Sequence, residues 1–120
     1  MIMFNIKNII IINVFLTSNN TIINVSNLEN KTVCIMSCGL LNIKGSRRST
    51  SYASQSIATV LGSKLRNLGF KYACIKLKGF GSGKYSCLKG FTNSGILLLD
   101  IIDKTSLPFN GCRSFKKRRI

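Results

Sequence analysis

The most constraining feature of this sequence is an amphipathic helix that separates two groups of β-rich segments. The helix is expected to begin near Ser49 or Thr50, because either side chain can cap a helix N-terminus. Gly69 stands where the glycine that ends a helix belongs. Between these points apolar residues recur at spacings of three and four, which predicts one buried stripe: Ala53, Ile57, Val60, Leu61, Leu65 and Leu68.

Three short β-rich runs precede this helix. They cover residues 9–16, 21–26 and 32–37, and turn-forming residues separate them. Short strands joined by tight turns favour an antiparallel meander.

The second half of the chain has a different pattern. Residues 71–78 alternate between apolar and other side chains, as in a strand, and a short helix is expected at about residues 86–94. Residues 96–102 form a nearly continuous apolar run, which is typical of a buried parallel strand. The predicted order is βββαβαβ, with parallel pairing in its later part. We expect a single α/β domain over residues 1–103 and a basic C-terminal tail over residues 104–120.

The acidic and imidazole side chains needed for most catalysis are nearly absent. The chain has no His, and its carboxylates are Glu29, Asp100 and Asp103. General acid–base catalysis and hydrolytic metal sites depend on such groups. The sequence therefore predicts no catalytic residues, no metal site, no cofactor and no small-molecule substrate.

The cysteines favour neither disulfides nor a zinc site. They form no C-x-x-C pair and their number is odd. Small buried thiols are the expected state of all of them: Cys34, Cys38, Cys74, Cys87 and Cys112.

Residues 1–15 are rich in Ile, but Asn and Lys interrupt them, so no membrane span is expected. They also lack the features of a signal or transit peptide. The abundance of Ile, Asn and Lys in the chain is typical of AT-rich coding, and we hypothesise synthesis inside an organelle. An AT-rich bacterial or parasite genome would leave the same bias.

A large excess of positive charge predicts a polyanionic partner. The chain has 18 Lys and Arg residues against 3 Asp and Glu, a net charge of +15. Such a domain repels itself and attracts nucleic acid. RNA is the expected partner, and any specificity would come from RNA shape and exposed bases.

The first segment that could bind phosphate is the basic loop, residues 44–50. It lies between a strand and the N-terminus of the long helix, where unpaired N–H groups and a partial positive charge favour anions. A solvated loop beside a capped helix is the alternative. The candidate RNA-binding residues here are Lys44, Ser46, Arg47, Arg48 and Ser49.

The second segment is the glycine loop, residues 78–84, which also follows a strand and opens a helix. Alternate glycines let backbone N–H groups approach an anion closely. A plain flexible turn is the alternative. The candidate residues are Lys78, Gly79, Gly81, Gly83 and Lys84.

The third segment is the end of the C-terminal tail. Blocks of like charge are typical of disordered interaction arms. A localisation signal or a solvated chain end is the alternative. The candidate residues are Asn110, Gly111, Arg113, Lys116, Lys117, Arg118 and Arg119.

Four motifs in one order resemble the universal small-subunit ribosomal protein eleven (S-eleven) family. They are residues 18–22 (SNNTI), 44–50 (KGSRRST), 78–83 (KGFGSG) and 110–113 (NGCR), the last followed by KKRR at 116–119. The resemblance covers about residues 9–120 and adds Asn19 and Asn20 to the candidate RNA-binding residues. Phe80 and Ser82 stand where the family normally has prolines, which implies a looser glycine loop.

The resemblance implies a ribonuclease-H-like, three-layer α/β fold with a mixed five-stranded sheet in the order 3-2-1-4-5. It implies a structural protein of the small ribosomal subunit that functions in translation on the platform, near the mRNA exit side. Its partners would be small-subunit rRNA and neighbouring ribosomal proteins, with mRNA nearby and no membrane. The expected location is the mitochondrial ribosome, with a plastid-type organelle or the bacterial cytoplasm as alternatives. A nuclease of the same fold and a membrane-surface binder are the rival functions.

Overall fold

The computed structural model describes residues 8–119. The elements follow the predicted βββαβαβ order, with short 3-10 turns between the third strand and the first helix. They are β1 (Ile9–Leu16), β2 (Thr21–Asn27), β3 (Thr32–Ser37), η2 (Cys38–Leu41), η3 (Gly45–Ser49), α1 (Ser51–Asn67), β4 (Tyr72–Gly79), α2 (Lys84–Asn93) and β5 (Leu97–Asp103). The expectation for the start of the chain falls partly on residues 1–7, which lie outside the described residues.

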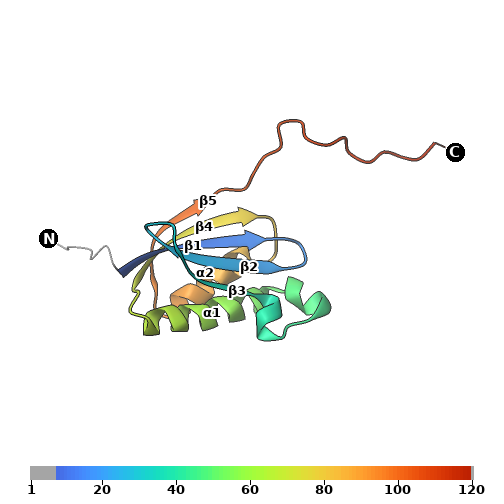
Figure 1. The fold of residues 1–120 in the computed structure, drawn as a ribbon. Helices are drawn as coiled ribbons and strands as arrows, with labels where there is room; N and C mark the ends of the chain where they lie inside the picture. The colour runs from blue at the N-terminus through green and yellow to red at the C-terminus, as the bar shows by residue number, and fades with distance from the viewer. Residues whose placement is uncertain (1–7, 120) are drawn as a thin grey trace.

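The strands form one mixed five-stranded sheet in the order β3-β2-β1-β4-β5, which confirms the predicted fold class. β2 pairs antiparallel with both β1 and β3, as the meander requires. β4 pairs parallel with both β1 and β5. As a result β1, β3, β4 and β5 all run in the same direction, and only β2 runs against them (Figure 1).

Both helices lie on the same face of the sheet, so the described chain has two layers rather than the three that the resemblance implies (Figure 1). The connections from β3 to β4 and from β4 to β5 both cross the sheet in the same direction. Crossovers between parallel strands are right-handed, and two crossovers in one direction place their helices on one face. The strand order itself therefore accounts for the missing third layer.

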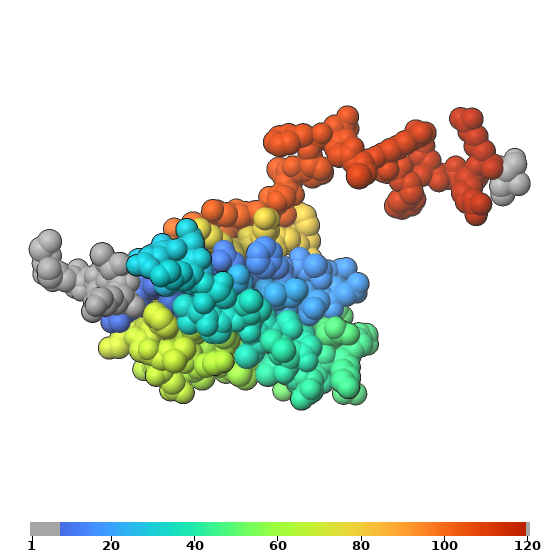
Figure 2. Space-filling model, viewed as in Figure 1, coloured from blue at the N-terminus to red at the C-terminus, as the bar shows by residue number. Residues whose placement is uncertain are grey.

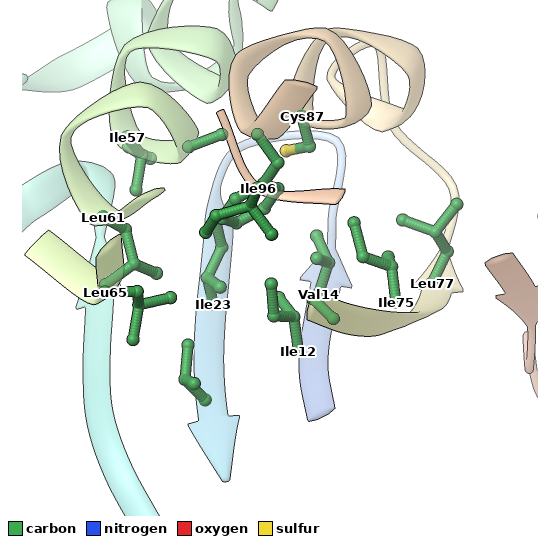
Figure 3. Packing of buried hydrophobic residues seen from close by; sticks show 14 of the residues in the cluster. Ile12, Val14, Ile23, Ile57, Leu61, Leu65, Ile75, Leu77, Cys87 and Ile96 are labelled. Atoms are coloured by element: carbon green, nitrogen blue, oxygen red, sulfur yellow. The ribbon is translucent and has the colours of Figure 1, made fainter. Parts of the chain in front are cut away.

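The core lies between this sheet face and the helices. In β1 the alternate residues Ile10, Ile12 and Val14 are fully buried, whereas Phe15 on the opposite face is exposed. Figure 3 shows Ile12 and Val14 in the same cluster as Ile57 of α1. Side chains alternate between the two faces of a strand, so one apolar set fills the core and the other faces outward.

β5 is not the buried strand that its apolar run predicts. Leu97 is 59% exposed and Ile101 is 51% exposed. The strand is at the edge of the sheet, where it has a neighbour on one side only, and just Leu98 packs against the core. The apolar run therefore predicted the strand correctly, but the prediction that this strand is buried was wrong.

The buried stripe of α1 also differs at two predicted positions. Ala53, Ile57, Leu61 and Leu65 are buried as expected, but Val60 and Leu68 are exposed. Val60 lies to one side of the buried stripe, and Leu68 is the C-cap residue beyond the last helical turn. Thr50, not Ser49, is the N-cap, and its side chain accepts a hydrogen bond from the Ala53 backbone N–H.

The cysteines are unpaired, but their burial is uneven. Cys38 and Cys87 are buried as expected, while Cys34 and Cys74 are half-buried. Burial raises the pKa of the Cys87 thiol to about 12. Cys112 is exposed, contrary to expectation, because it lies in the tail rather than in the core.

The contact between the helices allows no larger residue at Gly90 of α2. A Cβ atom there would lie 2.6 Å from Cβ of Ala58 and 2.7 Å from the Gln55 carbonyl oxygen. Gly90→Ala is expected to lower the free energy of unfolding by about 1–3 kcal/mol, because the helices must move apart. Urea unfolding of the full chain measures this. Gly39→Ala is the control, since the atom nearest to a Cβ at Gly39 is the Ser37 hydroxyl oxygen, 3.8 Å away. Equal free energies of unfolding for the two variants would contradict the close helix contact at Gly90.

Candidate nucleic-acid interface

The candidate segments leave the sheet at one edge, which here means the side where the carboxyl ends of β1, β3, β4 and β5 lie and not the edge strand β5. β1, β3, β4 and β5 run in the same direction, so their carboxyl ends meet there. The turn after β1, the basic loop after β3, the glycine loop after β4 and the tail after β5 all start from this edge (Figure 1). The topology therefore brings together segments that are far apart in the sequence.

The backbone of the basic loop is held by its own hydroxyl groups. The Thr50 hydroxyl donates to the Arg47 carbonyl oxygen at 2.7 Å, and the Ser49 hydroxyl donates to the Ser46 carbonyl oxygen at 2.6 Å. Arg47 is exposed and Arg48 is half-buried. Ser49 therefore has a structural role in this loop, while Lys44 and Arg47 present their charges to solvent.

The basic loop and the glycine loop are hydrogen-bonded to each other. The Ser82 hydroxyl donates to the Ser49 carbonyl oxygen at 2.6 Å, and the Ser51 hydroxyl donates to the Ser82 carbonyl oxygen at 3.1 Å. Ser82 thus makes a contact that the proline expected here from the resemblance could not make. The two predicted phosphate-binding loops form one continuous surface.

The alternate glycines serve close packing inside the protein. A Cβ at Gly79, whose φ is +103°, would lie 2.1 Å from the Leu16 carbonyl oxygen, and a Cβ at Gly81 would lie 2.9 Å from the Thr17 carbonyl oxygen. The Gly79 N–H already donates to the Thr105 hydroxyl at 3.3 Å. These glycines therefore let the loop lie against the turn after β1, a role that sequence reasoning did not foresee.

Gly83, the third glycine of the glycine loop, lies against a buried polar contact beside α1. The Thr21 and Ser54 hydroxyls lie 2.8 Å apart, and a Cβ at Gly83 would lie 2.0 Å from the Ser54 hydroxyl. The polar contact joins the start of β2 to the first turns of α1, and Gly83 leaves room for it.

The two predicted asparagines of the β1–β2 turn play different parts. The Asn20 side-chain oxygen accepts from the Thr21 backbone N–H at 2.9 Å, and its backbone carbonyl accepts from the Thr17 N–H at 3.0 Å. Asn19 is exposed at the tip of the turn. Asn20 shapes the turn, whereas Asn19 is presented outward.

One predicted cation is already paired. Lys84, the first residue of α2, forms an ion pair and hydrogen bond with Asp103 at the end of β5. Hydrogen bonds from Lys84 and Thr105 lower the pKa of the Asp103 carboxyl to about 2. Within residues 8–119, Lys84 and Lys31 are the cations that form ion pairs, so most positive charges have no carboxylate beside them.

Two cations that the sequence did not single out, Lys76 and Lys104, join the predicted Lys78 on the open face of the sheet. Lys76, Lys78 and Lys104 line a hollow of about 160 Å³ together with Phe15. The Lys78 ammonium lies 5.9 Å from the centre of the Phe15 ring. The alternation in β4 was a usable signal, because Lys76 and Lys78 had to share one face.

The tail does not join this surface. Residues 104–119 have no helix or strand, and Figures 1 and 2 show them extending away from the body. Lys104 starts the tail with a backbone hydrogen bond to the Leu77 carbonyl oxygen at 2.7 Å. The cluster of cations at residues 116–119 is exposed, as are Asn110, Gly111 and Arg113. The tail as a whole lies apart from the basic loop (Figure 2).

Other kinds of site find little support in the described residues. Residues 8–119 contain no group of three Cys, Asp or Glu placed to hold a metal ion. Neither helix in this part of the chain is long and apolar enough to cross a membrane.

Comparison with known proteins gives a consistent set of relatives. Residues 10–119 match the family model described as Ribosomal protein S11. The chain is 41% identical over 110 residues to the small ribosomal subunit protein uS11m of Prototheca wickerhamii, covering 92% of this chain and 86% of the relative. It is 42% identical over 104 residues to uS11m of Marchantia polymorpha (87% and 83% covered). It is 36% identical over 104 residues to uS11c of Tupiella akineta (87% and 80% covered).

The Lys84–Asp103 pair generates a pH prediction. A carboxyl whose pKa falls from its ordinary 3.8 to about 2 stabilises the fold above that ordinary value, and the contribution is lost as the pH falls through about 2. An NMR titration of the Asp103 carboxyl carbon should give a midpoint near this lowered value. Lys84→Gln should raise the midpoint, whereas the control Lys89→Gln, on the exposed side of α2, should not. A midpoint unaffected by Lys84→Gln would rule out the pairing.

Proposed function

Because this chain belongs to the ribosomal protein S11 family, and is therefore a structural constituent of the small ribosomal subunit that functions in translation, we propose that it binds small-subunit rRNA. The proposed contacts are its basic loop, glycine loop and tail. It is not an enzyme, as the shortage of acidic and imidazole side chains predicted. The binding is assembly without bond-breaking chemistry: cations neutralise crowded phosphates, and the folded domain sets the geometry of the RNA around it.

The observation that carries this proposal is the joined surface of the two loops. Hydrogen bonds between Ser49, Ser51 and Ser82 hold the loops together at the N-terminal end of α1. Lys44 and Arg47 are exposed there. A rigid surface of unpaired cations beside helix N–H groups matches a phosphate backbone without large reorganisation.

The tail adds charge without adding a fixed shape. Its cations at residues 116–119 are exposed on an extended segment. An extended basic segment becomes ordered when it contacts RNA, so it can follow a groove or a strand that the rigid domain cannot reach. We assign the domain, residues 1–103, to positioning and the tail, residues 104–120, to additional phosphate contacts.

Family membership also supports a position and a compartment. We infer a place on the platform of the small subunit near the mRNA exit side, with neighbouring ribosomal proteins as further partners and mRNA nearby. The relatives include mitochondrial and chloroplast proteins as well as bacterial ones, in agreement with the expected location and its alternatives. We assign the chain to the mitochondrial ribosome.

The salt dependence of binding tests the roles of the segments. Replacing Lys116, Lys117, Arg118 and Arg119 with Ala should weaken binding to small-subunit rRNA and reduce the slope of log K against log salt by about 3, since each lost phosphate contact removes about 0.7–0.9. Filter binding over a range of salt concentrations measures the slope. An unchanged slope would rule out this role for the tail.

A matched pair of double variants tests the basic loop. Arg47→Ala with Arg48→Ala should reduce the slope by about 1.5. Lys64→Ala with Lys71→Ala removes the same charge from exposed positions near the opposite end of the sheet and should leave the slope nearly unchanged. Equal effects from both pairs would indicate a diffuse attraction to RNA rather than binding at this edge.

A further inference from the structure

We propose that a cavity beside the basic loop receives a single unpaired RNA base, which stacks on the ring of Tyr52. The inference rests on the proposed rRNA binding and adds the kind of nucleotide recognised. The cavity has a volume of about 620 Å³, within the range of about 300–1,000 Å³ usual for ligand sites. Its lining residues are Asn42, Ile43, Lys44, Arg47, Thr50, Tyr52 and Ala53.

Tyr52 is placed as a stacking surface. It is the second residue of α1 and is 79% exposed, although its neighbour Ala53 is buried in the core. The tyrosine ring therefore contributes little to the core. Tyr52 also lines a second hollow, together with Gln55 and Val60. Exposed aromatic side chains of this kind bind the flat faces of unstacked bases.

The charges around the cavity favour a base that is attached to phosphates. Lys44 and Arg47 line it, and none of the carboxylates Glu29, Asp100 and Asp103 does. Ile43 and Ala53 add apolar side chains to the same lining. A nucleotide matches this arrangement, because its base is flat and weakly polar while its flanking phosphates are anionic.

Hydrogen bonds within the protein hold the walls of the cavity. Backbone hydrogen bonds from Asn42 to the Gly39 carbonyl and from Ile43 to the Cys38 carbonyl, both 3.2 Å, hold one wall. The Thr50 hydroxyl donates to the carbonyl oxygen of Arg47, another lining residue, at 2.7 Å. Asn42 adopts a left-handed conformation, with φ of +60°. A preformed site loses less entropy on binding than one that must be ordered by its ligand.

Binding measurements with the full chain test the proposal. The probe is the shortest fragment of small-subunit rRNA that retains wild-type affinity. Tyr52→Ala should weaken binding by about 5- to 150-fold, the usual effect of removing one aromatic–base stack. Tyr52→Phe should bind within about twofold of the wild type, because the ring is kept. The salt slope should stay unchanged in both, since no charge is lost.

A matched control comes from α2. Tyr85 is 76% exposed and does not line the cavity, so Tyr85→Ala should leave affinity nearly unchanged. Both tyrosines are on helix surfaces and alanine favours a helix, so neither variant should unfold the chain, which circular dichroism would verify. Equal losses in Tyr52→Ala and Tyr85→Ala would overturn the assignment of this cavity.

Abasic substitutions in the RNA identify the base. Removing one particular base should weaken binding to the wild type as much as Tyr52→Ala does, with no further loss when both changes are combined. Additive losses at every position would overturn the proposal. Full RNA affinity in Tyr52→Ala would also overturn it and favour a side chain of a neighbouring ribosomal protein as the occupant. If the wild type bound RNA without salt dependence, the proposed function itself would fail.

Discussion

Burial of one sheet face makes it possible for so basic a chain to fold. A net charge of +15 opposes any compact state, because like charges repel one another. The structure keeps those charges out of the interior: apolar side chains of β1, β2, β4 and both helices fill a single core. Gly90 and Ala58 bring the helices close enough to share that face. Every other feature depends on this division between an apolar interior and a cationic exterior.

Strand direction then determines where the cations gather. Since β1, β3, β4 and β5 run in the same direction, the segments that follow them start from one edge. The basic loop and the glycine loop begin more than 30 residues apart, yet Ser49 and Ser82 are in direct contact. The ion pair of Lys84 with Asp103 links the start of α2 to the end of β5 at the same edge. The resulting surface combines a hydrogen-bonded backbone with exposed cationic side chains, an arrangement suited to a folded polyanion.

The two kinds of basic segment make different physical contributions. In the proposed complex with rRNA, the loops, whose backbone is held by hydrogen bonds, would determine the register between protein and RNA at little entropic cost. The tail is extended and would lose conformational freedom in that complex, so its charge would strengthen binding only where RNA is close enough to order it. The contact proposed for Tyr52 and its cavity would respond to an unpaired base rather than to charge.

The sequence by itself determined the elements, their order along the chain and the three cationic segments, because periodicity and turn chemistry act over a few residues. The resemblance to a family added the strand order. Only the tertiary structure decided which apolar run was buried: most of residues 96–102 belong to the edge strand β5, where Leu97 and Ile101 are exposed, and burial depends on neighbours that no local pattern specifies. It also decided the packing roles of Gly79 and Gly81 and the cavity at Tyr52, because each depends on segments brought together by the fold.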